Sequence, residues 1–159
     1  MRAKIMLIEE MREIIKEKQK DGLEVVFTNG CFDILHIGHA RYLAEARKKG
    51  DCLVLGLNSD SSVRNLKGSK RPLVSENERA ELLSYLEVVD YIVIFEELTA
   101  EKTISVLKPD IYVKGGDYEI DDIPEAKVVS KYGGIAEILS LVEGSSTTCI
   151  VEKIVEKYK

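Results

Sequence analysis

Short apolar runs alternate along the chain with longer segments whose apolar positions recur at helical spacing. The apolar runs end in glycine or polar residues and carry few charges, which is typical of strands buried on both faces of a parallel sheet. This pattern predicts five strands, at residues 24–30, 52–60, 90–95, 110–116 and 135–141. It predicts helices at residues 5–20, 38–50, 75–89, after Thr99, at 124–132 and at 145–158.

Local signals mark several of these boundaries. Ser75 followed three residues later by Glu78 forms a capping box at a helix start, and Pro124 suits a first helical turn. Because strands and helices alternate throughout, we predict an α/β fold: a Rossmann-like, doubly wound, parallel five-stranded sheet with helices on both faces. An extra N-terminal helix (1–22) precedes the α/β core (23–159), and the whole chain, 1–159, is predicted to form a single domain.

In such sheets, ligands bind beyond the carboxyl ends of the strands. The turn "TNGCFDILHIGH" after the first strand holds the only two histidines, His36 and His39, with Gly38 opening a helix. Imidazoles beside a helix N-terminus can grip phosphate oxygens as uncharged N–H donors. Two other interpretations stay open: a metal site completed by Asp33, and histidines satisfied by backbone carbonyls.

The turn "NSDSSVRNLKGSKRP" follows the second strand. It concentrates four cations, Arg64, Lys67, Lys70 and Arg71, in a chain of net charge −5. A lysine in such a loop can bridge phosphates, although a solvated basic loop has the same composition. Asp60 suits a ribose, sugar or metal contact, and an Asx-turn explains it equally well.

Two further turns carry glycine and hydroxyl groups. In "EGSSTT" (143–148) four hydroxyl residues precede a helix, which fits an N-cap or a nucleotide-phosphate site. In "VKGGDY" two glycines permit close approach to a ring or sugar, as in an ordinary turn. The sequence has neither a Walker-type P-loop nor a G-x-G-x-x-G motif, and Cys31 has no evident base. The reaction type that remains is a direct in-line displacement at a phosphorus, without a covalent intermediate on the protein.

Composition limits the partners. With 28 acidic and 23 basic residues the chain has no general affinity for nucleic acid. The longest apolar runs fall short of the ~20 residues that span a bilayer, so no membrane partner is expected. Three cysteines without metal-type spacing predict a reducing, cytoplasmic location.

"HIGH" (36–39) after "NGCFD", with "GSSTT" (144–148) far downstream, resembles the two motifs of the HxGH nucleotidylyltransferases. The stretches at 57–73, 78–97 and 107–118 resemble the adenylyltransferase domains of bifunctional heptose-phosphate kinase/adenylyltransferases, over roughly residues 23–155. The resemblance implies transfer of AMP from ATP, with Mg²⁺, to D-glycero-β-D-manno-heptose 1-phosphate. The products are ADP-heptose, for lipopolysaccharide core synthesis, and pyrophosphate.

The same resemblance implies residue roles. His36 and His39 stabilise charge on the α-phosphate and the leaving pyrophosphate, and Lys67 clamps the phosphates. Residues expected to hold the nucleotide phosphates are Gly30, Cys31, Phe32, Ser146, Thr147 and Thr148. Residues expected to border the nucleoside are Gly115, Gly116 and Asp117. Candidates for the sugar-phosphate side are Asp33, Asn58, Asp60 and Arg79, and no protein metal ligand is implied.

Departures from related families shape the expectation. Leu141 and Cys31 stand where glycerol-3-phosphate cytidylyltransferases tend to carry Arg and Thr, which favours ATP over CTP. The resemblance does not extend to a kinase domain, so a separate heptose kinase is expected. Relatives are commonly dimers, so a homodimer is expected as well. The alternatives are another small-acceptor nucleotidylyltransferase (using glycerol 3-phosphate with CTP, or resembling FAD synthetase) and a non-catalytic adenine-nucleotide-binding module.

Overall fold

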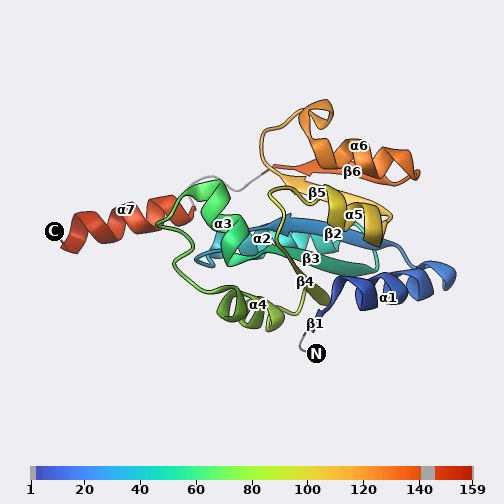
Figure 1. Cartoon of the computed structure of the whole chain (residues 1–159), viewed down its shortest axis with the longest axis horizontal. Helices are drawn as coiled ribbons and strands as arrows, with labels where there is room; N and C mark the ends of the chain where they lie inside the picture. The colour runs from blue at the N-terminus through green and yellow to red at the C-terminus, as the bar shows by residue number, and fades with distance from the viewer. Residues whose placement is uncertain (1–2, 141–145, 159) are drawn as a thin grey trace.

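The protein is built around a parallel sheet, seen in a computed structural model that describes residues 3–140 and 146–158. Within these residues the sheet has six strands in the order β1-β4-β3-β2-β5-β6 (Figure 1). Every neighbouring pair is parallel. The strands are β1 (Lys4–Met6), β2 (Val25–Gly30), β3 (Cys52–Asn58), β4 (Tyr91–Phe95), β5 (Ile111–Gly115) and β6 (Ile135–Leu139).

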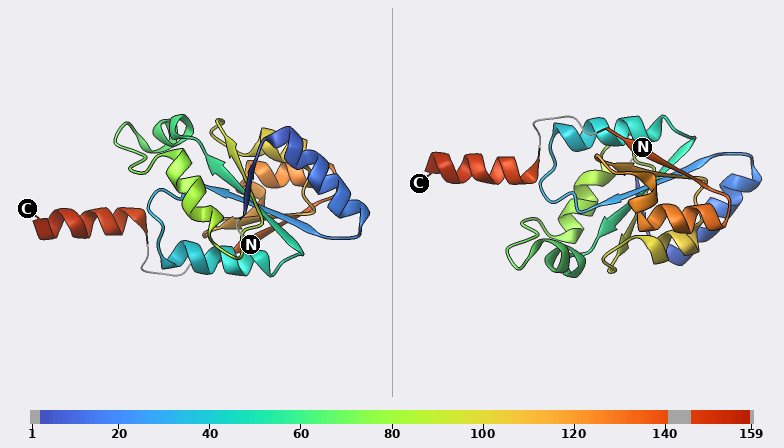
Figure 2. Two further views of the ribbon diagram at one scale, coloured as in Figure 1. Left: turned by 90° about the horizontal axis from the view of Figure 1, so that it is seen from below. Right: turned by 90° about the horizontal axis from the view of Figure 1, so that it is seen from above.

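Helices cover both faces of the sheet (Figure 2). Buried side chains of α1, α5 and α6 form one core cluster with the sheet, and those of α2 and α4 form another on the opposite face. The doubly wound parallel architecture is therefore confirmed. The helices are α1 (Ile8–Lys20), α2 (Ile37–Arg47), α3 (Asp60–Lys67), α4 (Glu76–Ser84), α5 (Glu101–Leu107), α6 (Pro124–Lys131) and α7 (Thr147–Tyr158), with a 3₁₀ turn η1 (Ile120–Asp122).

The number of strands predicted from the sequence was wrong. Residues 4–6, assigned to the N-terminal helix, instead form β1, which pairs with β4 at the edge of the sheet. The helix begins only at Ile8. The apolar residues Met6 and Leu7 fit helical spacing, but Leu7 is 67% exposed and precedes the helix, so the spacing there was accidental.

A second difference concerns the segment predicted as a basic loop after β3. Its first part is α3, which Ser59 caps by accepting a hydrogen bond from the Ser62 backbone amide. Gly68 ends the helix with a φ of 94°, a conformation that glycine adopts without strain. Only the residues after Gly68 form a loop, so Lys67 extends from the last turn of a helix.

One buried polar contact fixes α2 against the sheet. The Tyr42 hydroxyl lies 2.6 Å from Thr28 Oγ1 on β2 and donates to the Val113 carbonyl of β5. Burial raises the pKa of Tyr42 to about 12, so its hydroxyl remains protonated and available to donate. The start of α2 is thereby held beside the carboxyl end of β2, where the histidines lie.

The last helix, α7, extends away from the sheet (Figure 1) and has no buried residue. At its start Thr147 Oγ1 donates to the Ile34 carbonyl over 3.4 Å. Leu141, Glu143, Gly144 and Ser145, on which parts of the sequence interpretation depended, lie outside the described residues. Among the described helices, none combines the length and apolar character that crossing a membrane requires.

Candidate active site

A pocket of about 890 Å³ lies at the carboxyl ends of the central strands. That volume accommodates a nucleotide with a second small molecule, since ligand pockets commonly measure ~300–1,000 Å³. The predicted site residues that line it are Gly30, Cys31, Phe32, Asp33, His36, His39, Asn58, Lys67, Ser146, Thr147 and Thr148. Those that do not line it are Asp60, Arg79, Gly115, Gly116 and Asp117.

The two imidazoles stack at the start of α2. Their ring centroids are 3.8 Å apart, with an interplanar angle of 23°. His36 is the N-cap of the helix, and its Nδ1 accepts a hydrogen bond from the Gly38 amide over 3.1 Å. Because Nδ1 accepts, the proton of neutral His36 sits on Nε2. In this tautomer, His36 Nε2 carries an N–H group.

Both rings are held uncharged. Burial lowers the pKa of His36. Burial, and in addition the electrostatic interaction between the two rings, lowers the pKa of His39 to about 4. The sequence interpretation expected neutral rings because of the positive helix end, whereas desolvation is the larger cause here. Among the described residues, His39 Nδ1 is a buried atom without a hydrogen-bond partner. If the His39 ring stays neutral, no unpaired charge is buried at this atom.

The turn between β2 and α2 lines the pocket through Cys31 and Phe32. Phe32 adopts a φ of 46°, in the left-handed region that non-glycine residues rarely occupy. Its ring lies 5.0 Å from that of His39, centroid to centroid, and so supports the imidazole from behind. Burial raises the pKa of the Cys31 thiol, against the opposing charges of Lys67 and Arg79. The thiol therefore stays protonated.

Asp33 connects this turn to the loop after α3. Its Oδ2 accepts from Arg71 over 2.8 Å, and its Oδ1 accepts from the amides of Leu73 and Val74. Burial alone would raise the pKa of Asp33, but these hydrogen bonds outweigh it and lower the pKa. The predicted substrate contact is thus occupied by the protein itself, and Asp33 holds the loop beside Lys67.

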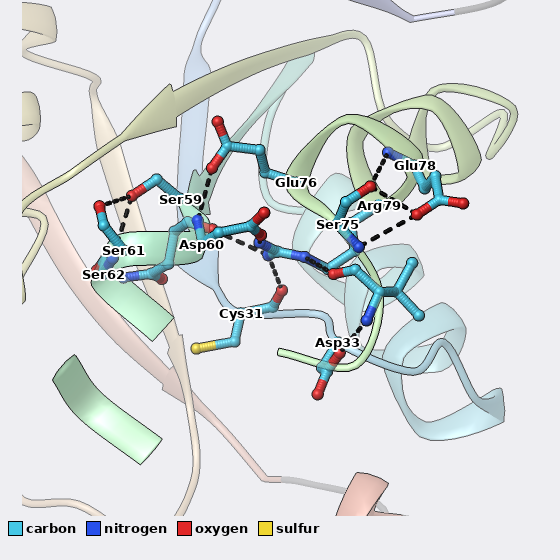
Figure 3. Close-up of polar contacts among 12 residues, drawn as sticks. Cys31, Asp33, Ser59, Asp60, Ser61, Ser62, Ser75, Glu76, Glu78 and Arg79 are labelled. Carbon is cyan, nitrogen blue, oxygen red and sulfur yellow. Dashed lines mark hydrogen bonds and ion pairs between the residues drawn. The ribbon is translucent and has the colours of Figure 1, made fainter. Parts of the chain in front are cut away.

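Arg79 occupies a similar internal role (Figure 3). It is 1% exposed and donates to the backbone carbonyls of Val74, Cys31 and Asn58. Its Nη2 also pairs with Asp60 Oδ1 over 2.7 Å. Arg79 and Asp60 therefore join the ends of β2 and β3 to the start of α4, where the predicted capping box of Ser75 and Glu78 is present. The guanidinium faces protein acceptors instead of the pocket.

The structure adds pocket residues that the sequence did not indicate. They come from α2, the ends of β2 and β5, the loop after α3, the β4–α5 loop and the segment from β5 to the first turn of α6. The polar and aromatic ones are Asn29, Tyr42, Arg71, Thr99, Lys114, Tyr118, Asp122 and Glu125. Arg71 was counted among the basic cluster, and Lys114 stands in the quoted "VKGGDY", but neither was assigned to the site. Arg64 and Lys70 are exposed and do not line the pocket.

Comparison with known proteins identifies the family. Residues 27–153 match the model of the family described as cytidylyltransferase-like. The chain belongs to this family. Within it, the chain is 51% identical over 157 residues to "Bifunctional protein HldE" of Syntrophotalea carbinolica, and 50% identical over 156 residues to that of Geobacter sulfurreducens. These alignments cover 99% and 98% of this chain but 32% of each relative, so the chain spans about a third of their length.

A solved structure agrees with this assignment. The crystal structure of the lipopolysaccharide core biosynthesis protein from Thermoplasma volcanium superposes with a TM-score of 0.63. It shares 37% sequence identity, and the match covers 78% of this chain and all of that protein's chain.

The described residues build no metal cage of their own. Among them, no three His, Cys, Asp or Glu side chains are grouped so as to hold a metal ion. In particular, the Asp33 oxygens already accept hydrogen bonds, so the alternative site of His36, His39 and Asp33 is not formed. Magnesium in phosphate-handling sites binds largely through substrate phosphates and water. A magnesium ion carried by a nucleotide would need no such cluster from the protein.

Proposed function

We propose that this protein transfers AMP from ATP to D-glycero-β-D-manno-heptose 1-phosphate, forming ADP-heptose for lipopolysaccharide core synthesis and releasing pyrophosphate. The observation that carries the proposal is the pair of stacked, uncharged imidazoles at the mouth of a nucleotide-sized pocket. The family membership, the similarity to HldE proteins and the structural neighbour support the choice of reaction and acceptor.

The reaction needs no covalent intermediate on the protein. A phosphate oxygen of the sugar 1-phosphate attacks the α-phosphorus of ATP, and the bond from that phosphorus to the bridging oxygen of pyrophosphate breaks. The His36 N–H and the neutral His39 ring face the charge that develops on the phosphate oxygens. Because the rings are preorganised by stacking and by the Gly38 hydrogen bond, little reorganisation accompanies the reaction.

Other groups bind and orient the nucleotide. Lys67, at the end of α3, adds a cation to the pocket, which Arg71, paired with Asp33, also lines. Thr147 and Thr148 at the start of α7 supply hydroxyls and first-turn amides, the groups that bind phosphate at helix N-termini. Mg²⁺, if carried in with the nucleotide, would neutralise part of the phosphate charge.

Pyrophosphate release tests the proposal. The protein is incubated with Mg²⁺ and either ATP or CTP, each with heptose 1-phosphate, glycerol 3-phosphate or FMN. We expect release only with ATP and heptose 1-phosphate, and none from a His36→Ala, His39→Ala double variant. Turnover with another pair would replace the proposed substrates. ATP binding without turnover by any pair would leave the adenine-nucleotide-binding module as the function.

A further inference from the structure

Residues from both faces of the sheet line the pocket. The histidines lie on only one of these two sides. His36 and His39 belong to α2, which packs on the same face as α4. Phe27 and Tyr112 belong to the opposite core, beneath α1, α5 and α6. Since side chains alternate along a strand, Asn29 on β2 lies on the Phe27 side of the sheet. Lys114 on β5 follows Tyr112 onto the same side.

Asn29 is held in one orientation. The Tyr112 hydroxyl donates to Asn29 Oδ1 over 2.9 Å. Tyr112 is fully buried, and burial together with the Glu125 charge raises its pKa, so the hydroxyl stays protonated. Gly56 on the adjacent strand leaves the space for this packing, because a Cβ there would lie only 3.2 Å from Asn29 Cβ. With Oδ1 engaged, the Asn29 amide nitrogen is the group available to the pocket.

Two charged side chains accompany this amide. Lys114 lines the pocket near the end of β5, close enough to Cys31 for its charge to influence that thiol. Glu125, in the first turn of α6, is 3% exposed, and its Oε1 accepts from the Ala100 amide over 3.3 Å. An ammonium pairs with a phosphate, an amide N–H donates to a hydroxyl oxygen, and a carboxylate accepts from a hydroxyl. Together these groups match a sugar phosphate.

The direction of attack favours the same assignment. In phosphoryl-group transfer, the attacking and leaving oxygens lie roughly in line across the phosphorus. If the α2 side of the pocket holds the phosphates through the histidines, the acceptor approaches from the α5 and α6 side. We propose that Asn29, Lys114 and Glu125 form the subsite for the sugar-phosphate acceptor, with Tyr112 as the positioning residue for Asn29. This inference rests on the proposed adenylyl transfer.

Steady-state kinetics with matched variants test the subsite. Asn29→Asp replaces the amide donor at constant shape, and Lys114→Met removes the cation. We expect each to raise the KM for heptose 1-phosphate by about tenfold or more, with the KM for ATP changed by less than about twofold. Tyr112→Phe, which frees Asn29 without touching substrate, is expected to raise the acceptor KM by a smaller factor. Controls with the same charge changes are Asn77→Asp on α4 and Lys127→Met on α6, both exposed and outside the pocket.

A binding measurement separates this inference from the proposed function. Calorimetry with heptose 1-phosphate, in the presence of a non-hydrolysable ATP analogue, reports acceptor binding without turnover. Binding that weakens in the Asn29 and Lys114 variants supports the subsite, even where the wild-type protein shows no turnover. Turnover with an unchanged acceptor KM in these variants, or a raised KM for ATP alone, overturns the subsite while the function stands. An absence of acceptor binding to the wild-type protein overturns both.

Discussion

The buried guanidinium of Arg79 offers the sharpest test of how the pocket is held in shape. It makes four hydrogen bonds, to Val74, Cys31, Asn58 and Asp60, and these acceptors belong to three segments of the chain. Arg79→Met retains the length of the side chain and removes every donor. Three backbone carbonyls and one carboxylate then lose this partner.

The expected cost follows from these contacts. A buried polar group left without its partner costs ~1–3 kcal/mol, and breaking a buried ion pair costs ~3–5 kcal/mol. At the low end of that range the three carbonyls cost about 3 kcal/mol together, since methionine retains the packing. Asp60 keeps partial access to water, with its side chain 27% exposed, so the loss of the ion pair adds only about 1 kcal/mol. The free energy of unfolding should fall by about 3–5 kcal/mol, a large share of the ~5–15 kcal/mol typical of domains.

Urea unfolding followed by circular dichroism measures this loss. Arg41→Met on α2 is the matched control, because Arg41 is exposed and its replacement should change stability by no more than about 0.5 kcal/mol. Arg79→Lys keeps the charge but has one nitrogen, so it should fall between the two. A change below about 1 kcal/mol for Arg79→Met would refute the reasoning that these bonds hold the strand ends together.

Three further predictions concern the site. His36→Ala and His39→Ala should each lower kcat by ~100-fold or more while weakening ATP binding much less, and near-normal turnover would remove the residue from the mechanism. Lys67→Ala should impair both ATP binding and kcat, because the lysine meets phosphate charge throughout; Arg64→Ala, on the exposed side of α3, is its control. By NMR, the His39 ring should titrate near pH 4. Since the unfolded chain binds that proton near its usual pKa of ~6.5, stability should fall as pH drops from there toward 4, and a midpoint near 6.5 would contradict the burial argument.

Much of the fold could be predicted because the apolar runs and helix caps in the sequence agree with the strands and helices of the folded sheet. The buried apolar runs gave the five long strands, and Ser75 with Glu78 marked the start of α4. β1 was missed because it has three residues and gains its order from pairing with β4, a contact distant in sequence. α3 was missed although Ser59 and Gly68 are recognisable caps, because a run of basic residues is equally typical of a solvent-exposed loop.

The placement of the two histidines in the pocket could be predicted, because both lie in one turn at a helix start. The roles of Asp33, Asp60 and Arg79 could not, because composition places polar residues near strand ends without saying whether they face a ligand or one another. Asp33 meets Arg71 across 38 positions, and Asp60 meets Arg79 across 19. Asn29 gave a weak signal, a polar residue ending an otherwise apolar strand, and its meaning depends on Tyr112 from another strand.

The central claim is that the two imidazoles hold the α-phosphate of a bound nucleotide. A crystal structure with a non-hydrolysable ATP analogue and Mg²⁺ tests it most directly. The account predicts ring nitrogens of His36 and His39 within ~2.7–3.2 Å of phosphate oxygens, with Thr147 and Lys67 on the same triphosphate. A triphosphate bound away from α2, with the rings still stacked and in contact only with protein, would contradict it.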